Sequence, residues 1–145
     1  MTRHFIMVAE DDADDRYLMQ TALDETGFKE QVSFVDNGVE LIHNLEAIDE
    51  HNGTAPFPKL IMLDLNMPKM DGREVLKKIK SHDNFKRIPV VVFSTTKNQL
   101  EVQRCYDLGA NTYIVKPASY DRLVETIREV CTYWFKTATL IDNSL

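Results

Sequence analysis

The sequence is poor in cysteine, has no paired histidines and lacks any long apolar run, and each shortage excludes a class of protein. Its two cysteines, Cys105 and Cys131, lie far apart in segments with helical periodicity. This spacing fits neither a metal site nor a redox motif, so we expect both to be reduced packing residues. The four histidines are scattered, with no spacing that would place two zinc ligands on one helical turn. No apolar run approaches a membrane span and no secretory signal is present, which predicts a cytoplasmic protein.

Charge and length limit the function classes further. Lysine and arginine total 17 against 23 acids, a formal net charge of -6. Such a surface repels a phosphate backbone, so we expect no direct binding to nucleic acid. A length of 145 residues suits one compact domain. We therefore expect residues 1–145 to form a single domain, without a separate output module.

Short apolar segments alternate with segments of helical periodicity along the chain, which indicates an α/β protein. The pattern predicts five strands and five helices, which in chain order are Phe5–Ala9, Asp14–Thr26, Gln31–Val35, Gly38–Ile48, Leu60–Leu63, Glu74–Ser81, Pro89–Phe93, Asn98–Leu108, Thr112–Val115 and Tyr120–Phe135. A loop is expected over Asp49–Lys59, where glycine and two prolines occur. In the first helix, the apolar spacing places Leu18, Ala22 and Leu23 inward.

Five such units predict an open, doubly wound parallel sheet with helices on both faces, because strand–helix–strand crossovers are right-handed. In sheets of this kind, ligands bind beyond the carboxyl ends of the strands. The residues that follow each strand are therefore the first candidates for function.

Acidic, hydroxyl and amino side chains follow four of these strands. Glu10 and Asp11 follow the first strand, Asp64 the third, Ser94 the fourth and Lys116 the fifth. Carboxylates gathered in one cleft repel each other unless a cation lies among them. Ligands that are all oxygens favour a hard ion, so the pattern predicts a Mg²⁺ site.

The remaining two groups indicate phosphoryl chemistry. The ammonium of Lys116 and the hydroxyl of Ser94 fit a dianionic phosphoryl group bound beside the metal ion. A carboxylate at the end of a strand, such as Asp64, can attack a phosphoryl donor and form an acyl phosphate. The sequence therefore predicts phosphorylation of Asp64.

Each of these residues also has an ordinary structural explanation. Acids near a helix N-terminus stabilise it by about 0.3–1 kcal/mol per charge, which accounts for Asp14 and Asp15 but poorly for the acids directly after the strand. By themselves, Asp64 is also typical of a turn, Ser94 of a helix N-cap and Lys116 of a solvated residue before proline. Only the combination favours a functional site.

Taken together, these motifs resemble the receiver domains of two-component response regulators. The likeness covers nearly the whole chain and is carried by Val-Ala-Glu-Asp-Asp after the first strand, Leu-Asp-Leu-Asn-Met-Pro-Lys-Met-Asp-Gly around Asp64, Val-Phe-Ser-Thr-Thr at Ser94 and Tyr-Ile-Val-Lys-Pro at Lys116. It implies a flavodoxin-like sheet with strand order 2-1-3-4-5. It also implies that Glu10 and Asp11 bind Mg²⁺, with Asp64 as the phosphoacceptor and third ligand.

The resemblance assigns further roles. Asn66 would bind the metal through its backbone carbonyl, and Ser94 and Lys116 would contact the phosphoryl oxygens. Tyr113 would act with Ser94 as a switch that changes the surface of the fourth helix, fifth strand and last helix for partner binding. The peptide bond between Lys116 and Pro117 would be cis.

A narrower resemblance is to the stand-alone regulators of bacterial phytochrome histidine kinases. It rests on the segment Asp64–Leu76, on the loop around Pro56 and on the aromatic tail Tyr133–Leu140. It implies a sensor histidine kinase, of the phytochrome class, as the partner. Residues 134–145 are expected to form a C-terminal extension. Its apolar residues predict a symmetric homodimer through the last helix and this tail. Trp134 fits core packing and a dimer interface equally well.

Three function classes stay open at this point. The favoured one is a signalling domain that catalyses only its own phosphorylation and dephosphorylation. A Mg²⁺-dependent phosphohydrolase with an aspartyl nucleophile would need a second acid two positions after the nucleophile, but that residue is Asn66. A pseudo-receiver that only binds partners would lack an acid, the acceptor or the lysine, and none is missing.

Overall fold

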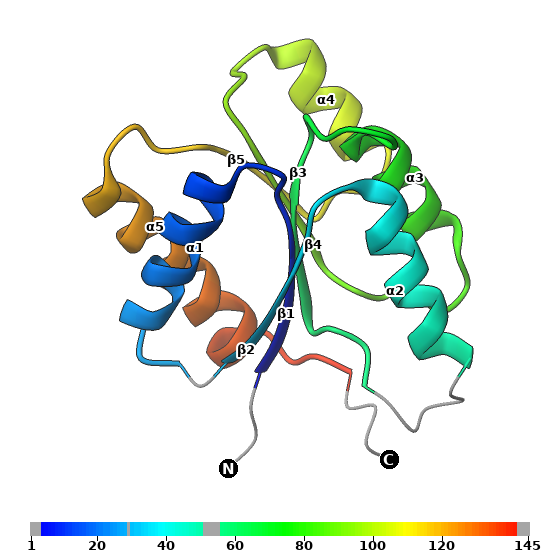
Figure 1. Ribbon diagram of the computed structural model, residues 1–145, viewed down its shortest axis with the longest axis horizontal. Helices are drawn as coiled ribbons and strands as arrows, with labels where there is room; N and C mark the ends of the chain where they lie inside the picture. The colour runs from blue at the N-terminus through cyan, green and yellow to red at the C-terminus, as the bar shows by residue number, and fades with distance from the viewer. Residues whose placement is uncertain (1–3, 29, 51–55, 142–145) are drawn as a thin grey trace.

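The chain folds into a five-stranded parallel sheet covered by helices on both faces (Figure 1). The computed structural model describes residues 4–28, 30–50 and 56–141. The strand order is β2-β1-β3-β4-β5, which confirms the predicted doubly wound α/β fold and its order. The elements in chain order are β1 (His4–Ala9), α1 (Ala13–Glu25), β2 (Glu30–Val35), α2 (Gly38–Glu50), β3 (Leu60–Asp64), α3 (Gly72–Ser81), β4 (Val90–Ser94), α4 (Gln99–Asp107), β5 (Thr112–Val115), α5 (Tyr120–Thr132) and the π-helical turn η1 (Tyr133–Thr137).

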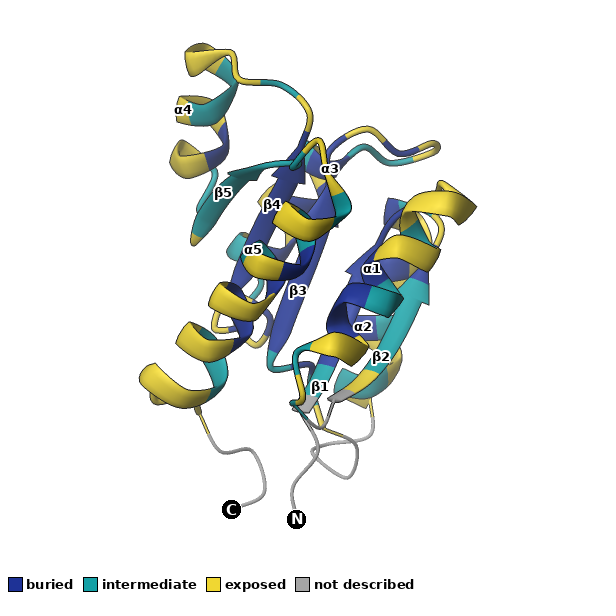
Figure 2. Ribbon diagram, turned by 90° about the vertical axis from the view of Figure 1, so that its left-hand side faces the viewer, coloured by how far each residue is buried: buried dark blue, intermediate teal, exposed yellow. Residues whose placement is uncertain are grey.

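The core consists of two apolar layers, one on each face of the sheet. Leu60 and Met62 of β3 pack with α1 and α5, whereas Ile61 and Leu63 pack with α2 and α3, because successive side chains of a strand point to opposite faces. Every residue of β3 and β4 is buried, and Figure 2 shows these strands inside the helical layers. This double coverage explains their nearly continuous apolar sequences.

Side-chain caps determine where the helices begin next to the carboxyl edge of the sheet. Asp12 accepts a hydrogen bond from the backbone N–H of Asp15 at the start of α1, at 2.9 Å. Asn98 accepts one from the N–H of Leu100 at the start of α4, also at 2.9 Å. Each cap stabilises its helix by about 1 kcal/mol. Because Asn98 caps α4, the alternative interpretation of Ser94 as an N-cap is wrong.

Three details differ from the sequence predictions. Leu18 is 39% exposed, because the buried stripe of α1 runs through Met19, Ala22 and Leu23 instead. Helix α2 continues to Glu50, two residues into the expected loop, and residues 51–55 of that loop lie outside the described part. Helix α5 ends at Thr132, where the hydrogen bonding widens to the π-helical pattern of η1 rather than continuing as an α-helix.

The expected cis bond before Pro117 is also wrong. No cis peptide bond occurs among the described residues, so the chain keeps the trans form that even proline bonds favour. Cys105 and Cys131 are buried without a disulfide, on opposite faces of the sheet, and their predicted packing role is confirmed. None of the helices in the described ranges combines the length and apolarity that a membrane span requires.

Candidate functional site

The register of the parallel strands brings the predicted site residues to one edge. Ala9 of β1 is paired with Leu63 of β3, so Glu10 follows β1 at the level where Asp64 ends β3. Asp64 is in turn paired with Phe93 of β4, which places Ser94 one residue beyond it. The carboxyl ends of three adjacent strands thus supply the two acids and the hydroxyl.

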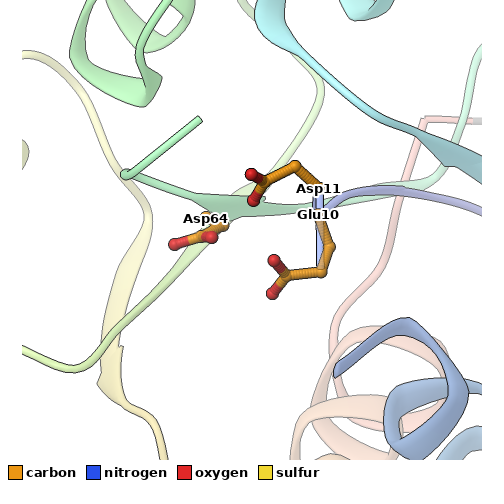
Figure 3. Close-up of side chains that lie close together, drawn as sticks. All are labelled: Glu10, Asp11 and Asp64. Atoms are coloured by element: carbon orange, nitrogen blue, oxygen red, sulfur yellow. The ribbon is translucent and has the colours of Figure 1, made fainter. Parts of the chain in front are cut away.

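Three carboxylates converge at this edge (Figure 3). One ligand oxygen from each of Glu10, Asp11 and Asp64 lies within 4.8 Å of the other two. Glu10 and Asp64 are buried, at 6% and 8% exposure, whereas Asp11 is exposed. In an octahedral Mg²⁺ shell, with bonds of about 2.1 Å, two oxygens lie up to about 4.2 Å apart. A small side-chain movement therefore closes this set on one divalent cation, and the oxygen-only donors fit Mg²⁺.

Lys116, which directly follows the edge strand β5, connects the carboxylates at the same end of the sheet. Its Nζ donates a hydrogen bond to Glu10 Oε1 at 2.9 Å and lies 3.6 Å from Asp64 Oδ2. A third carboxylate oxygen, Oδ2 of Asp15, lies 3.6 Å from the same nitrogen. The ammonium therefore offsets part of the repulsion among the acids, as a positive group in such a cluster must.

The electrostatics of the site is dominated by burial. Burial and, less strongly, the charge of Asp64 outweigh the opposing hydrogen bond from Lys116, and together they leave the pKa of Glu10 raised to about 7. For Lys116, burial lowers the pKa, but the hydrogen bond to Glu10 and the charge of Asp64 outweigh it and leave the pKa raised. A bound cation would therefore stabilise the ionised form of Glu10.

Backbone N–H groups orient two of the carboxylates. The N–H of Asn66 donates to Asp64 Oδ1 at 3.3 Å, and the N–H of Asp12 donates to Glu10 Oε2 at 3.3 Å. These two bonds help to fix the orientation of the carboxylates. Asn66 itself is exposed beside the acceptor, while the metal-binding role of its carbonyl stays a prediction.

The hydroxyl side of the site is linked to the switch residue through Thr96. Ser94 is buried at 1% exposure, and its Oγ accepts a hydrogen bond from the N–H of Thr96 at 3.2 Å. The carbonyl of Thr96 accepts a bond from the hydroxyl of Tyr113 at 2.9 Å. The N–H of Lys116 donates to the carbonyl of Ser94 at 2.8 Å. Ser94, Tyr113 and Lys116 thus share one hydrogen-bonded loop, and their predicted roles stay predictions.

Two residues near the acceptor carry more weight than the sequence indicated. Asp15 was expected only as an acid at a helix terminus, yet it also faces Lys116. Gly72, which precedes the predicted helix Glu74–Ser81, begins α3 so close to the acceptor that an added Cβ would lie 2.7 Å from the carbonyl oxygen of Asp64. The glycine at the end of the acceptor motif could have indicated this contact from the sequence, because a residue without Cβ allows close backbone approach.

Comparisons with known proteins agree with this geometry. A family model described as the response regulator receiver domain matches residues 6–128. Response regulator Rcp1 of Synechocystis sp. is 36% identical over 135 residues, which cover 93% of this chain and 91% of that protein. The crystal structure of the phosphorylated cyanobacterial phytochrome response regulator RcpA matches with a TM-score of 0.88 at 40% identity, covering 97% of this chain and 100% of that chain. The Mn²⁺-bound form of Rcp1 matches with a TM-score of 0.84 at 34% identity, covering 96% and 99%.

Proposed function

This chain belongs to the response regulator receiver family, and on that premise we propose that Asp64 accepts a phosphoryl group from the phosphohistidine of a sensor histidine kinase. The observation that carries the proposal is the convergence of carboxylate oxygens from Glu10, Asp11 and Asp64, with Lys116 bonded to Glu10 and close to Asp64. Burying several acids together is costly unless cations compensate them. Residues with a purely structural role would not require this arrangement.

In the proposed step, a carboxylate oxygen of Asp64 attacks the phosphorus in line. A new O–P bond forms as the P–N bond of the phosphohistidine breaks, and the released imidazole keeps the electron pair and takes up a proton. The burial of Asp64 limits competing water. Asn66 holds the other carboxylate oxygen through its N–H, which keeps the nucleophile in one orientation.

Mg²⁺ would be held by Glu10, Asp11 and Asp64, together with the carbonyl of Asn66. When bound, it supplies positive charge to the oxygens of the transferring group. Lys116 already lies beside Asp64, so its ammonium is in place to donate a charge-assisted hydrogen bond to a phosphoryl oxygen.

The switch follows from the loop that begins at Ser94. The hydroxyl of Ser94 can donate a charge-assisted bond to the phosphoryl group, and its movement toward that group strains the bond that Ser94 Oγ accepts from the N–H of Thr96. Because Tyr113 is bonded to the carbonyl of Thr96, a movement of this loop changes the position of Tyr113. Phosphorylation then favours one of two arrangements of α4, β5 and α5, and the altered surface is the output.

The chemistry of this acidic site favours a signalling role over turnover of a separate substrate. Asn66 stands where an aspartyl phosphohydrolase needs its general acid, so the protein acts only on its own phosphoryl group. We infer that the kinase is of the phytochrome class, since the matched relative RcpA is a phytochrome response regulator, and that the protein works in the cytoplasm beside it. Residues 1–145 then act as one receiver domain, with residues 134–145 as its C-terminal extension.

A symmetric homodimer through α5 and the tail is part of the same proposal. Tyr133 and Ile141 are 53% and 55% exposed, which supports an intermolecular contact. Trp134 packs partly against the core of its own chain, and Leu140 helps to line a cavity of about 80 Å³ with Phe57 and Ile88. Sedimentation at tens of micromolar protein tests the dimer. A protein that is purely monomeric both with and without a phosphoryl mimic contradicts it.

Labelling with a small phosphodonor tests the central proposal. With acetyl phosphate and Mg²⁺, the wild type should become labelled, and chelation of the metal should abolish the label. Asp64→Asn should remain unlabelled. Asp71→Asn is the matched control, because Asp71 caps α3 and pairs with Arg73 but is not one of the three clustered carboxylates, so its loss should leave labelling intact. Equal labelling of Asp64→Asn and wild type contradicts the proposal.

A further inference from the structure

Helix α4 is held in place by little apolar burial. All of its residues are described, and Cys105 is the only buried one. Leu100 is 78% exposed and Tyr106 is 47% exposed. Figures 1 and 2 show α4 at the carboxyl edge of the sheet, separate from α1 and α5. A helix with so small an apolar face depends on other contacts for its position.

Two polar contacts hold the two ends of α4. In its first turn, Glu101 accepts a hydrogen bond from Nε of Arg73 in α3. Near its last turn, the hydroxyl of Tyr106 accepts the N–H of Tyr113 at 3.0 Å. Tyr113 lies on β5, the last strand in the sheet order. The hydroxyl of Tyr106 therefore satisfies a backbone N–H at the edge of the sheet. The helix is thus attached to α3 at one end and to β5 at the other.

The contact between Arg73 and Glu101 is an ion pair in a partly desolvated setting. The side chains are 26% and 19% exposed, and Glu101 lies 28 residues away from Arg73 in sequence. The hydrogen bond with Glu101 raises the pKa of Arg73 further above its ordinary value. Charge-assisted bonds of this kind are stronger than those between neutral groups.

Arg73 is itself fixed to the acceptor loop. The N–H of the preceding residue, Gly72, donates to the carbonyl of Leu65 at 2.9 Å. A Cβ at Gly72 would lie 2.6 Å from Cα of Leu65 and 2.7 Å from the carbonyl oxygen of Asp64. The first turn of α3 therefore rests directly on the backbone of the acceptor residue.

We propose that the Arg73–Glu101 ion pair attaches α4 to the acceptor loop and forms a second connection between Asp64 and α4. The first connection runs along the chain through Ser94 and Thr96. The second crosses from α3 and does not involve the hydroxyl switch. Its regulatory consequence rests on the proposed function, since it matters only when Asp64 carries a phosphoryl group.

Native-state hydrogen exchange of the α4 amides tests the attachment without any phosphoryl group. Hydrogen bonds to charged groups contribute enough that Arg73→Gln or Glu101→Gln should raise α4 exchange about tenfold. Amides of β3 should keep their wild-type rates, which excludes a general loss of stability. The double variant should exchange no faster than either single variant, because both remove the same interaction.

A matched control is available on α5. Arg122 and Glu125 form an ion pair of 3.1 Å with side chains 70% and 57% exposed, and its removal should leave α4 exchange unchanged. Unchanged α4 exchange in both Arg73→Gln and Glu101→Gln overturns the attachment. An effect of the double variant equal to the product of the single effects also overturns it.

A second arm tests the coupling by adding beryllofluoride with Mg²⁺ as a phosphoryl mimic. In the wild type, beryllofluoride should change the exchange rates of the α4 amides several-fold. In Arg73→Gln, the fold-change in these rates should be less than half of the wild-type fold-change. Equal changes in the two proteins overturn the coupling. A wild type that does not bind beryllofluoride contradicts the proposed function instead, and the first arm then still decides the attachment.

Discussion

The pKa of Glu10 makes metal binding depend on pH in a range where ordinary carboxylates do not titrate. Burial raises that pKa to about 7 in the metal-free protein, and a protonated Glu10 cannot serve as a ligand. The apparent dissociation constant for Mg²⁺ therefore increases by the factor 1 + 10^(pKa − pH). This factor is about 11 at pH 6 and about 1.1 at pH 8, so affinity should rise about tenfold between them.

The same shift determines how stability depends on pH. The folded state holds the Glu10 proton more tightly than the unfolded state, whose value is 4.5. The resulting stabilisation is present below pH 4.5 and is lost as pH rises through about 7, an effect of about 3 kcal/mol in the metal-free protein. Above pH 7, Mg²⁺ should restore stability, because it binds the folded state.

Calorimetric titration with Mg²⁺ in buffers of different ionisation enthalpy measures both the affinity and the protons released. At pH 6 about 0.9 protons should be released per Mg²⁺ bound, and at pH 8 about 0.1. Glu10→Gln should bind more weakly and lose the pH dependence over this range. An affinity that is constant from pH 6 to pH 8, or no proton release at pH 6, would refute the reasoning.

Three substitutions, two near the site and one at the opposite edge of the sheet, test the packing by chemical denaturation. Gly72→Ala should destabilise the fold by about 1–3 kcal/mol, because its Cβ meets the backbone of Leu65; a neutral effect contradicts the close approach. Tyr113→Phe should cost about 1 kcal/mol through the lost bond to Thr96, and an unchanged midpoint shows that this bond is not formed. Lys80→Met keeps the aliphatic stem but loses three hydrogen bonds, so it should cost about 1.5–3 kcal/mol; wild-type stability contradicts their contribution.

The candidate site was readable from the sequence because parallel strands end at one edge. Once the strands were identified, Glu10, Asp64 and Ser94 had to lie on neighbouring strand ends, and the observed register agrees. The strands themselves were readable because a sheet covered on both faces needs uninterrupted apolar residues. These two inferences use only local pattern and topology.

Contacts between side chains on different helices and strands could not be predicted from the sequence. The pairing of Arg73 with Glu101 depends on how far α4 stands from α3, and nothing in either helix specifies the partner. The bond from Tyr113 to Thr96 likewise depends on the path of a loop. The inward position of Leu18 was predicted wrongly because the apolar spacing of α1 also fits Met19, and only the packing against α5 separates the two.

Identification of the modified residue tests the central claim most directly. After treatment with acetyl phosphate and Mg²⁺, borohydride reduces an acyl phosphate to an alcohol, which converts a phosphorylated aspartate to homoserine. Peptide mass spectrometry should then find homoserine at residue 64. Its appearance at another acid, or its absence from a protein that carries label, would contradict the assignment of Asp64 as the phosphoacceptor.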